Sequence, residues 1–325
     1  MFITAYYFRA HSYTIVPRHV SEDMAWMADH GTDAVALGIL EQDLFAAVEN
    51  FQLISEEANR AGMKVYAVPS RWGALVAGCP KVPSIFCAKH PEAAACGPDG
   101  SPRIDWLGVK ASVHHPATFE FFCESLRKMF ELFPVEGVVW DEVKNLHDRD
   151  YSDAARAALS GKDLDDVSVH TDAAARFFDR VGAEALSMKP DVRLCMFLFA
   201  HMKGFPVERC ARIEHLHDFG CDGRPFRGTD GGSNDSGATV SKKNLCDTGP
   251  YFVAQARANG KRPLFLVENH AMAEKDVPLM DARFPEVLSL GAEHVLYYYY
   301  PRSLRDPDRN MGVVGKHMKA AKGLA

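Results

Sequence analysis

Eight short apolar segments of β type alternate with longer helix-type segments, and this alternation limits the fold more than any other feature of the sequence. Alternating strands and helices favour a parallel sheet, and eight such units are the number that closes a (β/α)8 barrel. We therefore expect an α/β protein with one TIM-barrel domain over residues 1–325. The expected strands are 2–8, 33–40, 64–69, 137–141, 192–199, 215–219, 264–268 and 294–300. The expected helices are 21–30, 42–61, 116–132, 172–189, 206–212, 249–259, 280–290 and 315–322.

Two connections are longer than a barrel needs. Residues 70–115 follow the third strand as an extended loop or small subdomain, and the Gly-rich segment 220–240 follows the sixth strand. Both come after strands, so they belong to the C-terminal face, where barrel active sites are built. Long loops in compact domains are usually functional, although the Gly, Ser and Asp content of 220–240 is also typical of a mobile surface loop.

Composition excludes several classes of protein. The chain has 43 acidic residues against 37 Lys and Arg, a net charge of −6 and no basic run, which argues against a nucleic-acid partner. No apolar stretch approaches the roughly 18 residues of a membrane span, and the N-terminal sequence lacks a secretory signal, so we expect a cytoplasmic protein. The eight cysteines form no Cys-x-x-Cys pair, which favours reduced thiols. The sequence does not indicate an oligomeric state.

Carboxylates stand where two of the expected strands end. The fourth strand ends in Asp141-Glu142, and the seventh ends in Glu268. Acids facing one another across a barrel mouth are what cleavage of a glycosidic bond requires, so we expect these three residues to be catalytic. Neighbouring strand residues face opposite sides, so only one of Asp141 and Glu142 can point along the barrel axis. The alternative is that such acids cap helices or form ion pairs.

Aromatic, basic and polar side chains at or near the other strand ends are suited to sugar recognition. Aromatic rings offer apolar faces for the C–H surface of a sugar, and polar groups can bind its hydroxyls. Residues 297–300 are four consecutive tyrosines, and at most half of them can face the barrel because neighbours alternate. Any one of them could instead pack between the sheet and a helix. The expected ligand is a carbohydrate or another polyhydroxylated small molecule. The candidate binding residues are Tyr6, Arg9, Arg71, Trp72, His115, Lys144, His201, Asp218, His270, Tyr298, Tyr300 and Arg302.

The region 88–144 resembles a known order of motifs. Ala88-Lys89-His90-Pro91-Glu92, a Gly-Pro-Asp-Gly turn at 97–100, His114-His115-Pro116 and Val135-Glu136-Gly137-Val138-Val139-Trp140-Asp141-Glu142 follow one another. This order is similar to that of hypothetical glycosyl hydrolases of the barrel type, more distantly related to alpha-amylases and alpha-L-fucosidases. The resemblance covers about sixty residues strongly and implies a barrel glycosidase whose strand-four acid, here Asp141, is catalytic and usually the nucleophile.

The partner of Asp141 is left open by the same resemblance. Alpha-amylases have Arg where this chain has Val139, and a strand-five Glu where it has Phe199-Ala200-His201. Another barrel clan uses glutamates on strands four and seven, which Glu142 and Glu268 could match. A third group uses acids on strands four and six, which would recruit Asp218 or Asp222. We favour Asp141 with Glu268.

Two rival functions remain. A metal-dependent barrel hydrolase or isomerase could use Asp141 with the acids and histidines of 214–218 and 268–270, although the spacing matches no recognised metal motif. A carbohydrate-binding barrel without catalysis is the other rival.

The sequence has no recognised zinc-finger or nucleotide-binding motif. The spacing of Cys79, Cys87, His90 and Cys96 departs from that of zinc fingers, and nucleotide-binding motifs are absent. We therefore expect neither a metal nor a cofactor.

Overall fold

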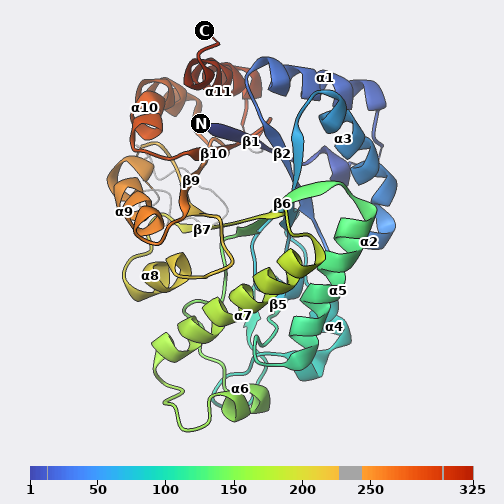
Figure 1. Cartoon of the computed structure of the whole chain (residues 1–325), viewed down its shortest axis with the longest axis vertical. Helices are drawn as coiled ribbons and strands as arrows, with labels where there is room; N and C mark the ends of the chain where they lie inside the picture. Colours follow the sequence, from blue (N-terminus) through green and yellow to red (C-terminus); the bar gives the residue numbers. More distant parts are fainter. Residues whose placement is uncertain (13, 227–243, 302–303, 325) are drawn as a thin grey trace.

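The computed structural model describes residues 1–12, 14–226, 244–301 and 304–324 (Figure 1). Eight parallel strands form a closed barrel in the order β1-β10-β9-β8-β7-β6-β3-β2, which confirms the expected (β/α)8 architecture. The barrel strands are β1 (Phe2–Tyr7), β2 (Ala34–Ile39), β3 (Lys64–Pro69), β6 (Val135–Asp141), β7 (Arg193–Phe199), β8 (Asp218–Gly223), β9 (Arg262–Val267) and β10 (His294–Tyr298).

Helices surround the barrel, as Figure 1 shows. Those that follow strands one to three are α1 (Pro17–Asp29), α2 (Asp43–Ala46), α3 (Val48–Arg60), α4 (Ile85–Lys89) and α5 (Pro116–Leu132). The later ones are α6 (Asp153–Ala158), α7 (Val167–Met188), α8 (Phe205–Ala211), α9 (Leu245–Ala258), α10 (Val277–Ser289) and α11 (Pro307–Lys322). No helix in these described ranges combines the length and apolar character needed to cross a membrane.

The helix ends follow local sequence signals. Gly62, Gly260 and Gly291 adopt positive φ angles of 77°, 67° and 96° just after α3, α9 and α10, which is the left-handed geometry that ends helices. The expected start of the first helix at residue 21 is wrong. Helix α1 begins four residues earlier at Pro17, because proline already has the φ of a first helical residue and needs no hydrogen bond there.

The expected sixth strand at 215–219 is also wrong in its bounds. Gly220 reads as a turn residue, but it lies inside β8 and pairs with Leu264 of β9. A Cβ atom on Gly220 would lie 1.6 Å from the carbonyl oxygen of Leu264, so only glycine permits this approach of the two backbones. Strand β8 therefore runs from Asp218 to Gly223, and its C-terminal end carries Asp222 instead of Asp218.

Strand alternation separates two cores. Val139 packs inside the barrel with Tyr6, Tyr66 and Phe197, whereas Trp140 packs outside against the helices. Asp141 follows the parity of Val139 and lies on the inner side. Of the tyrosine run 297–300, only Tyr298 packs with the inner group.

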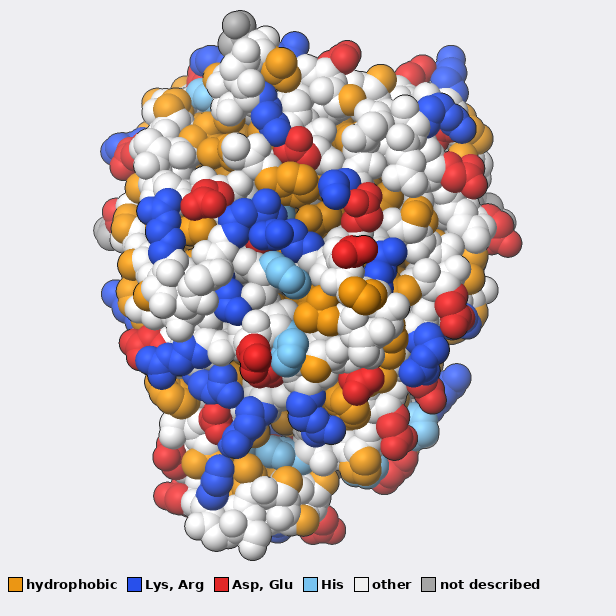
Figure 2. Space-filling model, viewed as in Figure 1, with side chains coloured by type: hydrophobic (Ala, Val, Ile, Leu, Met, Phe, Trp, Pro, Cys, Tyr) orange, Lys and Arg blue, Asp and Glu red, His pale blue; other side chains and the backbone are white. Residues whose placement is uncertain are grey.

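The connection between β3 and α5 contains secondary structure of its own. Besides α4, it includes the short 3-10 helices η2 (Trp72–Ala74) and η3 (Pro91–Ala93) and a hairpin of β4 (Ile104–Asp105) and β5 (Gly108–Val109). Of the expected loop 220–240, the start belongs to β8, and residues 227–240 lie outside the described residues. Acidic and basic side chains are interspersed over the face of the molecule in Figure 2.

Candidate active site at the barrel mouth

Three carboxylates from different strands meet at the C-terminal mouth of the barrel. Glu142 follows β6, Asp222 lies near the end of β8, and Glu268 follows β9. Each offers an oxygen within 4.8 Å of the other two. Asp222 and Glu268 are buried, and Glu142 is half-buried. Ionised carboxylates this close repel one another strongly, so the group favours a shared proton or a nearby cation.

Glu142 reaches this group because the backbone leaves the strand geometry at that residue. Its φ is +40°, in the left-handed region that residues with a Cβ rarely adopt. Strict alternation would have placed its side chain outside the barrel, next to Trp140. A strained residue of this kind costs roughly 1–3 kcal/mol and is typical of functional sites. The backbone turn thus brings the Glu142 carboxylate to the mouth although strict alternation assigns it to the opposite side from Asp141.

Two buried tyrosines line the inner wall beneath these acids. The rings of Tyr6 and Tyr298 lie 5.3 Å apart between centroids. Burial, and then the negative charge of Asp141, raises the pKa of both phenols well above the usual range. Both hydroxyls therefore stay protonated and can donate hydrogen bonds. Tyr6 Oη has no hydrogen-bond partner, so its donor is available to a ligand.

Basic groups flank the carboxylates. Lys144 Nζ forms an ion pair with Glu142 and lies 4.2 Å from the centroid of the Phe199 ring. Arg224 is buried near Glu268, and its Nη2 donates to the carbonyl oxygens of His270 and Ala271 at 3.1 and 2.8 Å. Burial lowers the pKa of the Arg224 guanidinium, and the charge of Glu268 partly opposes that shift.

Two expected histidines lie among the mouth residues. The His270 ring is 4.7 Å from that of Tyr298, in edge-to-face contact, and the His201 ring stacks on Phe199 at 5.2 Å. Arg71 follows β3, and its backbone N–H bonds Ala77, whose own N–H bonds the carbonyl of Asp141. The structure thus brings together the mouth residues that the sequence predicts: Tyr6, Arg71, Asp141, Glu142, Lys144, His201, Glu268, His270 and Tyr298.

Other predicted binding residues have structural contacts instead. Arg9 Nε donates to Asp23 of α1 at 2.5 Å, on the outer side of the sheet. The Trp72 indole is fully buried and donates to the Ile39 carbonyl at 2.9 Å.

Two further predicted binding residues also have structural contacts. His115 caps α5 by accepting from the N–H of Ala117, and the Tyr300 hydroxyl donates to Asp308 at 2.6 Å. Arg302 lies outside the described residues.

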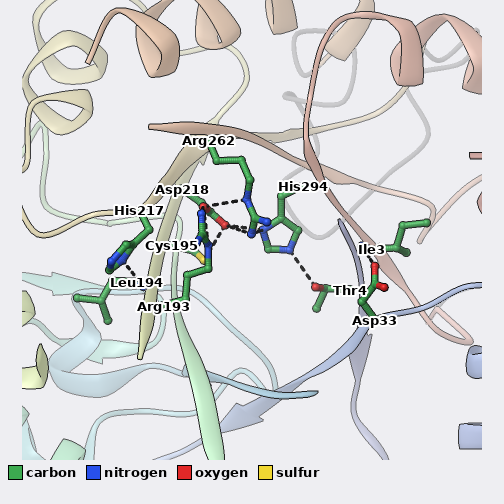
Figure 3. A network of polar contacts seen from close by, with 10 residues as sticks. All are labelled: Ile3, Thr4, Asp33, Arg193, Leu194, Cys195, His217, Asp218, Arg262 and His294. Atoms are coloured by element: carbon green, nitrogen blue, oxygen red, sulfur yellow. Dashed lines mark hydrogen bonds and ion pairs between the residues drawn. The ribbon is translucent and has the colours of Figure 1, made fainter. Parts of the chain in front are cut away.

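Asp218 lies at the opposite end of the barrel (Figure 3). It is the first residue of β8, and the first residues of β7, β9 and β10 all bond to its carboxylate. Arg193 Nη2 lies 2.6 Å from Oδ1, Arg262 Nε 3.0 Å from Oδ1 and His294 Nδ1 2.8 Å from Oδ2. Burial alone would raise the pKa of Asp218, but these hydrogen bonds hold it well below its usual range. The expected substrate role of Asp218 rested on the wrong strand bounds.

Asp222 is a site residue that the sequence indicates only as an alternative partner of the strand-four acid. The expected end of the sixth strand at Phe219 assigns it to the following loop. The signal was present, since Phe219-Gly220-Cys221 stops at a carboxylate just as strands four and seven do. Arg224, two residues further on, has no signal that distinguishes it from a surface arginine.

Two groups of side chains in the described ranges are close enough to hold a metal ion. One is the mouth group Glu142, Asp222 and Glu268, and the other is Cys195, Asp218 and His294. The second already has two guanidinium groups on Asp218, whose positive charge opposes a cation. All eight cysteines are free thiols.

A closed parallel barrel with acids at the C-terminal ends of its strands is an architecture that glycoside hydrolases share. The chain resembles alpha-L-fucosidase isoenzyme 2 from Paenibacillus thiaminolyticus, with a TM-score of 0.66 and 12% identity over 99% of this chain and 49% of that one. It also resembles the catalytic domain of beta-amylase from Paenibacillus polymyxa, with a TM-score of 0.67 and 10% identity over 98% of both chains. For a beta-galactosidase from Rahnella sp. R3 the TM-score is 0.67, with 13% identity over 99% and 56%.

Identities this low establish a shared fold and nothing finer. The chain spans about half the length of the fucosidase and of the Rahnella galactosidase, and nearly all of the amylase domain. No protein-family model and no curated protein matches the sequence.

Proposed function

We propose that this protein hydrolyses glycosidic bonds at the barrel mouth, with Glu142 and Glu268 as the catalytic pair. The observation that carries the proposal is the approach of their carboxylate oxygens to within 4.8 Å. Glycosidases that retain anomeric configuration place their two carboxyl groups about 5–5.5 Å apart, and inverting ones about 6.5–9.5 Å apart. The separation therefore favours a retaining mechanism. It also favours Glu142 over Asp141 as the partner of Glu268.

The surroundings of the two glutamates suggest their roles. Lys144 Nζ pairs with Glu142, which favours the ionised form that a nucleophile needs. Glu268 is buried close to Asp222, and both burial and this negative charge favour a protonated carboxyl, as a general acid requires, while the charge of Arg224 opposes them.

The reaction then has two steps. Glu142 attacks the anomeric carbon and forms a glycosyl ester, while Glu268 gives its proton to the departing glycosidic oxygen. Next, Glu268 takes a proton from water, whose oxygen attacks the anomeric carbon and releases Glu142. Asp141, Tyr6 and Tyr298 are placed to bind sugar hydroxyls during both steps, because phenols that stay protonated donate and a carboxylate accepts.

Single substitutions test the proposal. We expect Glu142→Gln to lower kcat for every aryl glycoside that the wild type cleaves by at least about 1,000-fold, since the nucleophile is lost. Glu268→Gln should lower kcat/KM strongly for poor leaving groups but should largely spare kcat/KM for 2,4-dinitrophenyl glycosides, which leave without a proton. Its kcat should fall for these activated substrates too, because the second step still needs Glu268 as a base. Hydrolysis rates across leaving groups provide the measurement.

The exposed Glu92→Gln is the matched control and should retain wild-type rates. Full activity of Glu142→Gln, or a loss of kcat/KM in Glu268→Gln that does not depend on the leaving group, would contradict the assignment.

A metal-dependent hydrolase or isomerase is the second candidate, and the same three carboxylates favour it. Carboxylate oxygens are ligands that Mg²⁺, Ca²⁺ and Mn²⁺ prefer. Activity that EDTA abolishes and added Mg²⁺ or Mn²⁺ restores would favour this candidate. Activity that is unchanged after EDTA and gel filtration would favour the proton-transfer mechanism.

A further inference from the structure

Arg71 is a largely buried cation whose guanidinium has no hydrogen-bond or ion-pair partner among the described residues. The residue is 9% exposed and stands directly after β3 at the mouth. Its Nε atom is buried without a partner there. Taking part of a charged group out of water without pairing it lowers the stability of the folded chain. Arg224, the other arginine buried to this degree in the described ranges, also has an unpartnered buried Nε, but its Nη2 donates to two backbone carbonyls.

The backbone holds Arg71 in place despite a second cost. Its φ is +62°, again in the left-handed region that arginine rarely adopts. The turn is fixed by Arg71 N–H to the Ala77 carbonyl at 2.9 Å and by Ala77 N–H to the Asp141 carbonyl at 2.7 Å. The turn thus ties Arg71 to the end of the strand that carries Asp141. Backbone strain and an unpaired charge at one residue indicate selection for a ligand over selection for stability.

We propose that Arg71 binds a carboxylate on the substrate, so that the enzyme acts on glycosides of uronic acids. This inference rests on the proposed glycosidase function. A guanidinium offers two parallel N–H donors that match the two oxygens of a carboxylate. The mouth is acidic and repels an anionic sugar, because it contains Asp141, Glu142, Asp222 and Glu268. An ion pair between the Arg71 guanidinium and the sugar carboxylate would offset this repulsion. A neutral sugar leaves the Arg71 guanidinium without an ion pair, so its free energy of binding is less favourable.

Binding of free sugars tests the proposal without any need for turnover. The probes are glucuronate and galacturonate, compared with glucose, galactose and galactose 6-phosphate, by calorimetry and by the shift in Tm. We expect a uronate to bind at least about 10-fold more tightly than its neutral parent. Tighter binding of the phosphate than of either uronate, or equal affinity for uronates and neutral sugars, would overturn the proposal.

Variants assign the effect to Arg71. In Arg71→Gln the Kd for the uronate should rise roughly 10- to 100-fold while neutral-sugar binding stays the same. Its Tm without ligand should be equal or higher, because an unpaired buried charge is removed. Arg71→Lys keeps the charge but loses the paired donors, and should show an intermediate Kd. Arg18→Gln removes an arginine whose side chain is 75% exposed in α1, and should bind like the wild type. Unchanged uronate affinity in Arg71→Gln would overturn the proposal.

The catalytic variants separate this inference from the proposed function. Glu142→Gln and Glu268→Gln should keep or increase the preference for uronates, since each removes a negative charge that repels an anionic sugar. If the wild type prefers uronates but cleaves no glycoside, the proposed function fails and the ligand assignment stands. If it cleaves neutral glycosides as fast as uronides, the ligand assignment fails and the proposed function stands.

Discussion

At the scale of single residues, two neighbouring tyrosines of β1 differ in the surroundings of their hydroxyls. Tyr6 Oη is buried without a partner among the described residues, whereas Tyr7, on the outer side of β1, donates to Asp23 Oδ2 at 2.6 Å. Both side chains are buried in similar β-strand surroundings. The two residues therefore form a matched pair for asking whether a hydroxyl serves stability or ligand binding.

We expect Tyr6→Phe to leave the free energy of unfolding unchanged or slightly higher, and to weaken substrate binding. Tyr7→Phe should instead lower the free energy of unfolding by roughly 1–3 kcal/mol, because it leaves Asp23 with one partner fewer, and should leave KM unchanged. Urea denaturation and steady-state kinetics measure the two effects. A larger loss of stability in Tyr6→Phe than in Tyr7→Phe would contradict this view of the mouth.

At the scale of elements, the sequence predicted all eight barrel strands, because buried parallel strands are apolar runs bounded by turn residues. The predicted bounds of β8 are wrong because glycine has two structural roles that a single sequence does not distinguish. Glycine can end an element through a positive φ, as Gly260 does, or allow two backbones to approach, as Gly220 does. The second use depends on Leu264 of β9, a neighbour 44 positions away, which local pattern cannot reveal.

Gly220→Ala should therefore destabilise the barrel severely, by at least about 3 kcal/mol, since β8 and β9 must separate to admit the methyl group. Gly312→Ala is the control. Gly312 lies inside α11, and a Cβ there meets no atom within 4 Å. That change should raise stability by up to about 1 kcal/mol. Thermal unfolding measures both, and a Gly220→Ala variant as stable as the wild type would contradict the β8 register.

The geometry of the mouth is less predictable from the sequence than the strands, for a related reason. Sequence pattern located Glu142 and Glu268 at strand ends, but alternation assigned Glu142 to the outer side. Its positive φ, which turns the side chain toward Asp222, comes from the tertiary setting of the β6 end. Arg71 was predicted as a binding residue, yet its lack of a partner is a property of the folded chain alone.

At the scale of the whole molecule, the two ends of the barrel handle charge differently. At the base, Asp218 is surrounded by Arg193, Arg262 and His294, and Thr4 Oγ1 lies 2.9 Å from His294 Nε2. At the mouth, Glu142, Asp222 and Glu268 gather within 4.8 Å of one another, and Lys144 pairs with Glu142. The base thus has one acid neutralised by two guanidinium groups, whereas the mouth concentrates acids.

The base should make stability depend on pH. Burial lowers the pKa of His294, with Asp218 opposing the shift and Arg262 adding to it. His294 therefore stays neutral in the folded chain where the unfolded chain binds a proton, below about pH 6.5. Because the unfolded state then holds more protons, stability falls as pH drops from 7 to 5. Asp218, with a lowered pKa, contributes stability that is lost only at lower pH, beginning near pH 4.

We expect His294→Asn to be less stable at pH 7 but to lose less stability than the wild type between pH 7 and pH 5. Some dependence should remain, since burial also lowers the pKa of His114 and His217. Urea unfolding at several pH values provides the measurement, with His147→Asn on the exposed surface as control. Equal slopes in the wild type and His294→Asn would contradict the account of the base.

The most direct test of the central claim is the anomeric configuration of the first sugar product, followed by proton NMR during hydrolysis of an aryl glycoside. The account predicts net retention by the wild type, and no product from Glu142→Gln. An inverted product, or retention that persists at full rate in Glu142→Gln, would contradict it.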